Sequence, residues 1–160
     1  MNHKQLKVLF SDVDGTLTDG NLLYGLQGEV LKIFHVKDGV GIKSWMNHGY
    51  DFGIISARSS EIVQTRMKEL NVSHVLLGAE NKEHIMNQWL RDHNYTWKNL
   101  AYIGDDVNDL PVLKLAGFSA APADAITEVL QIVNYPCSTP GGKGAVREII
   151  DFLLDSICPS

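Results

Sequence analysis

Short apolar runs alternate with stretches of helical periodicity along the chain. The runs are of strand length and cover residues 6–10, 52–56, 74–77, 100–103, 118–121 and 132–133. Apolar side chains that recur every three or four residues indicate helices with one buried face. The clearest stripes are Ile62, Val63, Met67 and Leu70; Ile126, Val129, Leu130 and Val133; and Val146, Ile149, Ile150, Leu153, Leu154 and Ile157. This alternation predicts an α/β fold in which helices pack against a parallel sheet.

One segment does not follow the alternation. Residues 21–24 and 30–34 have the pattern of two short strands around a four-residue loop at 25–28, which predicts a β-hairpin at about residues 20–35. Apolar residues occur on both faces of these strands. Because a lone hairpin is not stable in water, we expect it to pack either on neighbouring subunits or on its own domain.

Two acidic clusters each follow directly after a predicted strand. Asp12 and Asp14 come after the first strand, and residues 104–109 follow the strand at 100–103. Residues i and i+2 of an extended segment point to the same side, so Asp12 and Asp14 converge where open α/β sheets hold ligands. Like charges this close need a shared cation or proton. A solvated Asp-Gly turn would explain the first cluster alone, but two clusters favour a site for a hard cation.

Two further residues lie where a phosphate group would need hydrogen-bond donors. Ser56 ends the strand at 52–56, and Lys82 lies at the start of a predicted helix. A hydroxyl, an ammonium group and the N–H groups at a helix start are typical donors to phosphate. Each residue alone has a simpler explanation, because serine often caps helices and lysine is mostly a surface residue. Their order along the chain favours the phosphate site.

Composition and charge argue against several other classes. The 160 residues carry a net charge of −5 and include 44% hydrophobic residues, values close to those of an ordinary globular domain. No run of Lys and Arg could neutralise a nucleic acid, and no apolar run is long enough to span a membrane, so neither is an expected partner. Cys137 and Cys158 lack C-x-x-C spacing, which favours a reducing, cytoplasmic setting. The six histidines show no zinc-ligand pattern.

Taken together, four motifs resemble in order and spacing those of the haloacid dehalogenase-like phosphohydrolases: Asp12-Val13-Asp14-Gly15-Thr16, Ser56, Lys82 and residues 104–109. Within this family, a small branch acts on eight- or nine-carbon sugar acid phosphates, and the chain is similar to it at residues 12–20, 34–39, 104–106 and 141–148. The resemblance implies one domain over residues 1–160 with a Rossmann-like, doubly wound sheet. It also implies that no cap domain is present and that the hairpin occupies the position of a cap.

The resemblance implies an Mg²⁺-dependent phosphatase and a role for each motif residue. Asp12 would attack phosphorus and form an aspartyl phosphate, while Asp14 would act first as general acid and then as general base. Mg²⁺ would be held by Asp12, by Asp105 and by the main-chain carbonyl of Asp14. Ser56 and Lys82 would bind the phosphate oxygens.

Further residues are implied as supporting or substrate-binding groups. Asp106 and Asp109 would orient the reacting groups without touching the metal. Arg58 and Arg66, about two helical turns apart, would meet the sugar acid together with Asp14 and Lys82. A substrate-binding loop would consist of Val36, Lys37, Asp38 and Gly39, with His35 beside it.

Three functions remain open within this branch. The first is hydrolysis of 3-deoxy-D-manno-octulosonate 8-phosphate in lipopolysaccharide precursor synthesis, which Arg58 favours because nine-carbon members typically have an acidic residue there. The second is hydrolysis of a nine-carbon sugar acid 9-phosphate. The third is a noncatalytic, oligomer-forming module of the same fold, against which the complete set of motif residues argues. The resemblance also implies a homotetramer.

Overall fold

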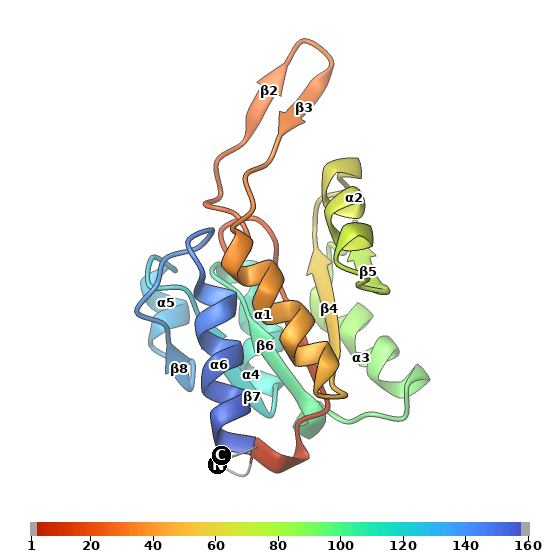
Figure 1. The fold of residues 1–160 in the computed structure, drawn as a ribbon, viewed down its shortest axis with the longest axis vertical. Coiled ribbons are helices and arrows are strands. Elements are labelled where there is room, and N and C mark those ends of the chain that lie inside the picture. The colour runs from red at the N-terminus through yellow and green to blue at the C-terminus, as the bar shows by residue number, and fades with distance from the viewer. Residues whose placement is uncertain (1–2, 158–160) are drawn as a thin grey trace.

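A parallel sheet forms the centre of the structure, a computed structural model that describes residues 3–157 (Figure 1). Its strands are β1 (Val8–Ser11), β4 (Asp51–Ser56), β5 (His74–Leu77), β6 (Leu100–Ile103), β7 (Phe118–Ala121) and β8 (Tyr135–Pro136). They lie in the order β5-β4-β1-β6-β7-β8, and each neighbouring pair is parallel. The expected α/β fold with a Rossmann-like parallel sheet is therefore confirmed.

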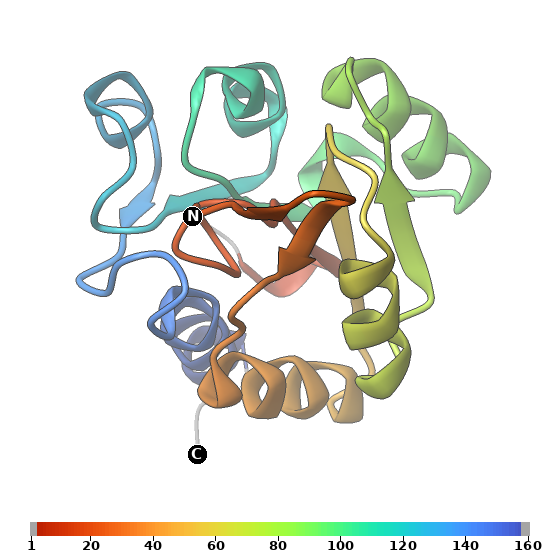
Figure 2. The ribbon, with the colours of Figure 1, turned by 90° about the horizontal axis from the view of Figure 1, so that it is seen from above.

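The helices lie on both faces of this sheet (Figure 2). They are α1 (Val36–Asn47), α2 (Glu61–Glu69), α3 (Lys82–Asp92), α4 (Leu110–Leu115), α5 (Thr127–Leu130) and α6 (Ala145–Ile157), with 3₁₀ turns η1 (His3–Gln5), η2 (Trp97–Asn99) and η3 (Val107–Asp109). Successive strand residues point to opposite faces: Leu9 of β1 packs in the core under α1, α2 and α6, and Val8 and Phe10 pack under α3, α4 and α5. The sheet is thus doubly wound. None of the helices in residues 3–157 is long and apolar enough to cross a membrane.

Strand β1 occupies the middle of the sheet and determines where the first acidic motif lies. Its last residue, Ser11, is in register with Ile54 of β4 and with Ile103 of β6. Asp12 therefore leaves the sheet between two strand ends, and its N–H donates to the Ile103 carbonyl at 2.9 Å. This arrangement brings the residues after β1, β4 and β6 to the same edge.

The sixth predicted strand, at residues 132–133, is wrong. The N–H groups of Ile132 and Val133 both donate to the Val129 carbonyl, which extends the turn that ends α5. The strand that pairs with β7 is β8, two residues further along. The apolar pair Ile132-Val133 fits both a strand and the helical stripe of residues 126–133, and the local hydrogen bonds favour the helical turn.

The predicted hairpin is present as β2 (Leu23–Gly25) and β3 (Gly28–Leu31), and it projects beyond the carboxyl ends of the sheet (Figure 1). Its loop is shorter than the expected four residues, because Gly25 pairs with Gly28 and leaves only Leu26 and Gln27 in the turn. Gly28 has φ of 114°, a conformation that favours glycine.

Candidate active site

Asp12 and Lys82 form the buried centre of the site. Lys82 begins α3, as predicted, and its side chain crosses to the end of β1, where Nζ lies 2.5 Å from Asp12 Oδ1 and 2.7 Å from Asp109 Oδ1. All three side chains are almost completely buried. A buried lysine requires paired charges, and here two carboxylates from distant parts of the chain supply them.

Asp109 is held by several donors at once. Besides Lys82, the Tyr102 hydroxyl donates to its Oδ1 at 2.5 Å, and the N–H groups of Asp105 and Asp106 donate to Oδ2 at 3.1 and 3.3 Å. Burial and the charge of Asp109 raise the pKa of Tyr102 well above its ordinary value, so that its hydroxyl stays a donor. The sequence did not single out Tyr102, because this residue fits the apolar pattern of strand β6.

Asp105 lies close to the turn that carries the first motif. Thr16 Oγ1 donates to Asp105 Oδ1 at 3.2 Å, and a Cβ atom on Gly15, whose φ is 95°, would lie 2.1 Å from Asp105 Oδ2. Any side chain at position 15 would therefore collide with the carboxylate. Burial, followed by the charge of Asp109, raises the pKa of Asp105 from 3.8 to about 6.

The acidic residues at this edge fit a divalent cation. Within residues 3–157, carboxylate oxygens of Asp12, Asp105 and Asp109 lie within 4.8 Å of one another. Burial, followed by the neighbouring Asp109 charge, raises the pKa of Asp12 well above its ordinary value, although Lys82 opposes this shift. Because Asp109 is already saturated with donors, Asp12 and Asp105 are the side chains available to Mg²⁺, a metal that prefers oxygen ligands.

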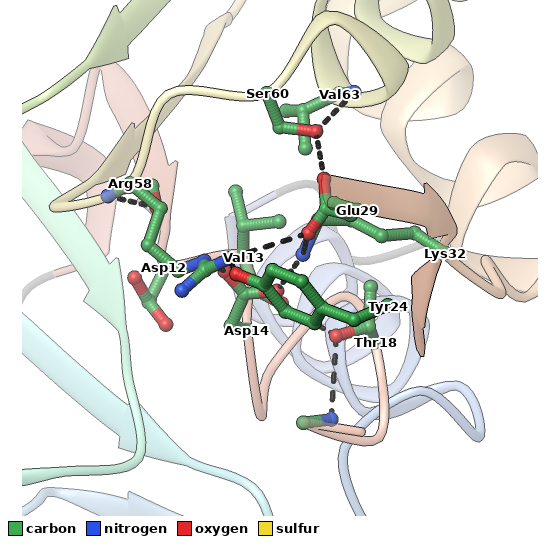
Figure 3. A network of polar contacts seen from close by, with 12 residues as sticks. Asp12, Val13, Asp14, Thr18, Tyr24, Glu29, Lys32, Arg58, Ser60 and Val63 are labelled. Atoms are coloured by element: carbon green, nitrogen blue, oxygen red, sulfur yellow. Dashed lines mark hydrogen bonds and ion pairs between the residues drawn. The ribbon is translucent and has the colours of Figure 1, made fainter. Parts of the chain in front are cut away.

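Asp14 is separated from this cluster by its own set of partners (Figure 3). Its Oδ1 forms a short ion pair with Lys32, and Arg58 Nε lies 3.7 Å from Oδ2. Glu29 and Tyr24 of the hairpin complete the network: Glu29 Oε1 lies 2.9 Å from Lys32 Nζ, and Arg58 donates to the Tyr24 hydroxyl at 2.6 Å. The sequence analysis missed these three hairpin residues, although a lysine between two apolar residues was an available signal.

Ser56 and Arg58 lie at the end of β4, as predicted. The Ser56 hydroxyl is buried and accepts a hydrogen bond from the Arg58 N–H at 3.2 Å. Arg58 precedes α2, so the two predicted helical turns between it and Arg66 are wrong. Arg66 instead pairs with Glu69 at 2.9 Å and lies over the Phe34 ring.

Residues 36–39 do not form the expected loop, because they are the first turn of α1. Asp38 is buried there, and its Oδ1 accepts from the Arg147 N–H at 2.8 Å, at the start of α6. Val36 is exposed, and Lys37 lines a surface hollow with Lys143 and Arg147.

The remaining predicted residues lie at the borders of the site. Gly39 lies against Arg66, since a Cβ atom at position 39 would be 2.7 Å from its guanidinium. His35 immediately precedes α1, and its Nδ1 is buried. Asp106 is exposed and caps η3 by accepting from the Val107 N–H at 2.6 Å. The structure thus brings Asp12, Lys82, Asp105 and Asp109 together and places Asp14 and Arg58 beside them.

Comparison with known proteins agrees with this arrangement. Residues 77–149 match the model of the haloacid dehalogenase-like hydrolase family. The chain is 40% identical over 153 residues to the 3-deoxy-D-manno-octulosonate 8-phosphate phosphatase KdsC of Haemophilus influenzae, covering 96% of this chain and 85% of the relative. It is 37% identical to KdsC of Escherichia coli K12, with coverage of 94% and 80%.

Solved structures give the same result. The cobalt-bound deoxy-D-mannose-octulosonate 8-phosphate phosphatase from Haemophilus influenzae superposes with a TM-score of 0.95 at 39% identity, covering 98% of this chain and 92% of that one. The Moraxella catarrhalis 3-deoxy-D-manno-octulosonate 8-phosphate phosphatase, in complex with magnesium, phosphate and KDO, has a TM-score of 0.93 at 34% identity, with coverage of 97% and 89%. The chain therefore belongs to the 3-deoxy-D-manno-octulosonate 8-phosphate phosphatase family of haloacid dehalogenase-like hydrolases.

Proposed function

We propose that this protein is an Mg²⁺-dependent phosphatase that hydrolyses 3-deoxy-D-manno-octulosonate 8-phosphate to the free sugar acid and phosphate, a step in lipopolysaccharide precursor synthesis. The observation that carries the proposal is the contact of Lys82 with Asp12 at the end of β1, with Asp105 beside them. The identity to KdsC proteins over most of the chain supports the substrate.

In the proposed reaction, Asp12 is the nucleophile. Lys82 contacts its carboxylate, and the hydrogen bond from the Asp12 N–H to the Ile103 carbonyl fixes its main chain at the exit of β1. Attack on phosphorus forms an aspartyl phosphate. Asp14 protonates the departing sugar alkoxide and afterwards accepts a proton from the hydrolytic water.

The remaining groups stabilise charge on the transferred phosphoryl group. Ser56 and Lys82 are suited to bind its oxygens, on which negative charge is spread in the transition state. Asp12, Asp105 and the main-chain carbonyl of Asp14 would hold Mg²⁺, whose positive charge would reduce the repulsion between carboxylate and phosphate. Asp109, which accepts a hydrogen bond from the Tyr102 hydroxyl, holds Lys82 in position.

Arg58 is the residue proposed to select the sugar acid. Its side chain is 39% exposed and is anchored by Tyr24 beside Asp14, where a permanent cation can pair with the substrate carboxylate. We expect Arg58→Glu to lower kcat/KM for the eight-carbon substrate by about tenfold or more while sparing small phosphate esters. Arg91→Glu on α3 introduces the same charge change as a control.

The substrate itself is tested with both sugar acid phosphates. We expect a higher kcat/KM for 3-deoxy-D-manno-octulosonate 8-phosphate than for a nine-carbon 9-phosphate. A preference for the nine-carbon compound would contradict the substrate assignment, and no Mg²⁺-dependent phosphate release from any ester would contradict the enzymatic function.

We also propose a homotetramer in which the hairpin packs between subunits. The apolar side chains of the hairpin and its two connecting segments are exposed within one chain: Leu22, Leu23, Tyr24, Leu26, Val30, Leu31 and Ile33. So many exposed apolar side chains in one segment are typical of an interface, and closed assemblies are the usual way to bury one. Light scattering should give a tetramer and a smaller species for Val30→Asp, with Ile132→Asp as the control. An active wild-type monomer would contradict the proposal.

Two broader predictions accompany this function. We propose that residues 1–160 act as one catalytic domain, with a hairpin insertion at about residues 20–35. The cytoplasmic setting stays a prediction that rests on cysteine usage. Cys137 is buried, and Cys158 lies outside the described residues.

A further inference from the structure

A lysine at the base of the hairpin is buried against the proposed general acid. Lys32 follows β3 directly and is 6% exposed, and its Nζ contacts Asp14 Oδ1 and lies 2.9 Å from Glu29 Oε1. Burial opposes the charged form of Lys32, but the contacts with Asp14 and Glu29 raise its pKa above the ordinary value. Two carboxylates thus pair with one ammonium group.

Glu29 is itself held in a defined position. Its Oε2 accepts a hydrogen bond from Ser60 Oγ at 2.5 Å, and Ser60 is the N-cap residue of α2. A continuous series of contacts therefore runs from the start of α2 through Glu29 and Lys32 to Asp14 (Figure 3). Glu29 and Asp14 therefore share the ammonium group of Lys32.

The two carboxyl oxygens of Asp14 are consequently not equivalent. Oδ1 contacts an ammonium group, which offers donors and no acceptor, so a proton on Asp14 belongs on Oδ2. Oδ2 is buried and has no hydrogen-bond partner among residues 3–157, and Arg58 Nε at 3.7 Å is beyond hydrogen-bond distance. Oδ2 is thus the atom from which Asp14 can donate.

We propose that Lys32 is a positioning residue for the general acid. By binding Oδ1 it assigns the transferable proton of Asp14 to Oδ2, and Glu29 holds Lys32 in place. As the bond from phosphorus to the sugar oxygen breaks, its electron pair stays on that oxygen, which takes the Oδ2 proton, while Asp12 forms the new bond to phosphorus. Lys32 then stabilises the Asp14 carboxylate that remains. This inference rests on the proposed phosphatase function.

The leaving group provides the test. A sugar alkoxide needs a proton to depart, whereas the phenolate of p-nitrophenyl phosphate leaves without one. The ratio kcat/KM reports the steps up to phosphorylation of Asp12, so it isolates the general acid from the later role of Asp14 as base. We expect Lys32→Met to lower kcat/KM at least about tenfold for 3-deoxy-D-manno-octulosonate 8-phosphate, within the range that general acids contribute, and less than about threefold for p-nitrophenyl phosphate.

Companion variants separate positioning from a structural role. Lys32→Arg keeps a cationic donor and should recover most of the sugar phosphate activity, while Lys43→Met, at an exposed position of α1, should resemble wild type. In a Lys32→Met background, Asp14→Asn should cause less additional loss than it causes alone, because both changes affect the same proton transfer. If Lys32→Met does not fold, Lys32→Gln gives the same comparison of substrates.

Two results would overturn the inference. One is an equal loss on both substrates, which would mean that Lys32 supports the fold or the binding of phosphate. The other is unchanged sugar phosphate activity in Lys32→Met. If wild-type protein does not hydrolyse the sugar acid phosphate but cleaves another alkyl phosphate, the proposed substrate is wrong, and the comparison is made with that alkyl ester instead.

Discussion

Replacing Asp105 with asparagine should stabilise the metal-free protein while removing its response to Mg²⁺. Asp105 lies within 4.8 Å of two other carboxylates, and one lysine cannot balance the three charges. Asparagine retains an oxygen that can accept the Thr16 hydrogen bond but carries no charge. The substitution therefore removes a buried charge, and with it the repulsion from Asp109, without removing the contact with Thr16.

The size of the expected stabilisation follows from the pKa of Asp105, which is raised from 3.8 to about 6 by burial and by Asp109. The charged form is thus disfavoured in the folded protein. Stability is unaffected below pH 3.8, falls as the pH rises toward 6, and stays low above it, because the folded state retains a proton that the unfolded chain has released. At about 1.4 kcal/mol per pKa unit, the loss at pH 7.5 is about 3 kcal/mol. Asp105→Asn should recover it, which corresponds to a Tm increase of about 6–12 °C.

Thermal unfolding in the presence of a chelator measures this effect. The Tm of wild type should fall between pH 4 and pH 6, and the Tm of Asp105→Asn should depend less on pH over this range. Mg²⁺ at about one hundred times its Kd should stabilise wild type by about 2.7 kcal/mol and leave the variant unchanged. Asp106→Asn makes the same charge change at an exposed neighbour and serves as the control. A variant Tm at or below that of wild type at pH 7.5 in chelator would refute the reasoning.

Three other substitutions test the site. Asp12→Asn should abolish phosphate release because an amide is not a competent nucleophile, and undiminished turnover would exclude Asp12 from that role. Lys82→Met leaves Asp12 and Asp109 buried without their cation. Urea unfolding without metal should show that the free energy of unfolding falls by about 3–5 kcal/mol, and a decrease below about 1 kcal/mol would contradict the contribution of these ion pairs. Gly15→Ala should weaken Mg²⁺ binding because the new Cβ meets Asp105. Gly28 also has a positive φ but has open space around it, so Gly28→Ala should affect only the free energy of unfolding.

The sequence by itself determined most of the elements and the main motif positions. Strands at 74–77, 100–103 and 118–121 coincide with the structure, because buried parallel strands leave short apolar runs between polar turns. Parallel strands also end at a common edge, so residues that follow such runs meet in space. The contact of Lys82 with Asp12, 70 residues apart, was foreseeable on this basis.

Only the tertiary structure decided which partners the polar side chains take. Asp38 was expected in a substrate loop, but it is buried and bonds to the Arg147 N–H, 109 residues away. In the sequence, Lys32 has the pattern of an ordinary hairpin residue, whereas in the structure the hairpin places its ammonium group against Asp14. Local periodicity indicates whether a residue is buried or exposed. Charge pairing depends instead on how distant segments pack, so the sequence around Lys32 does not indicate which carboxylate it contacts.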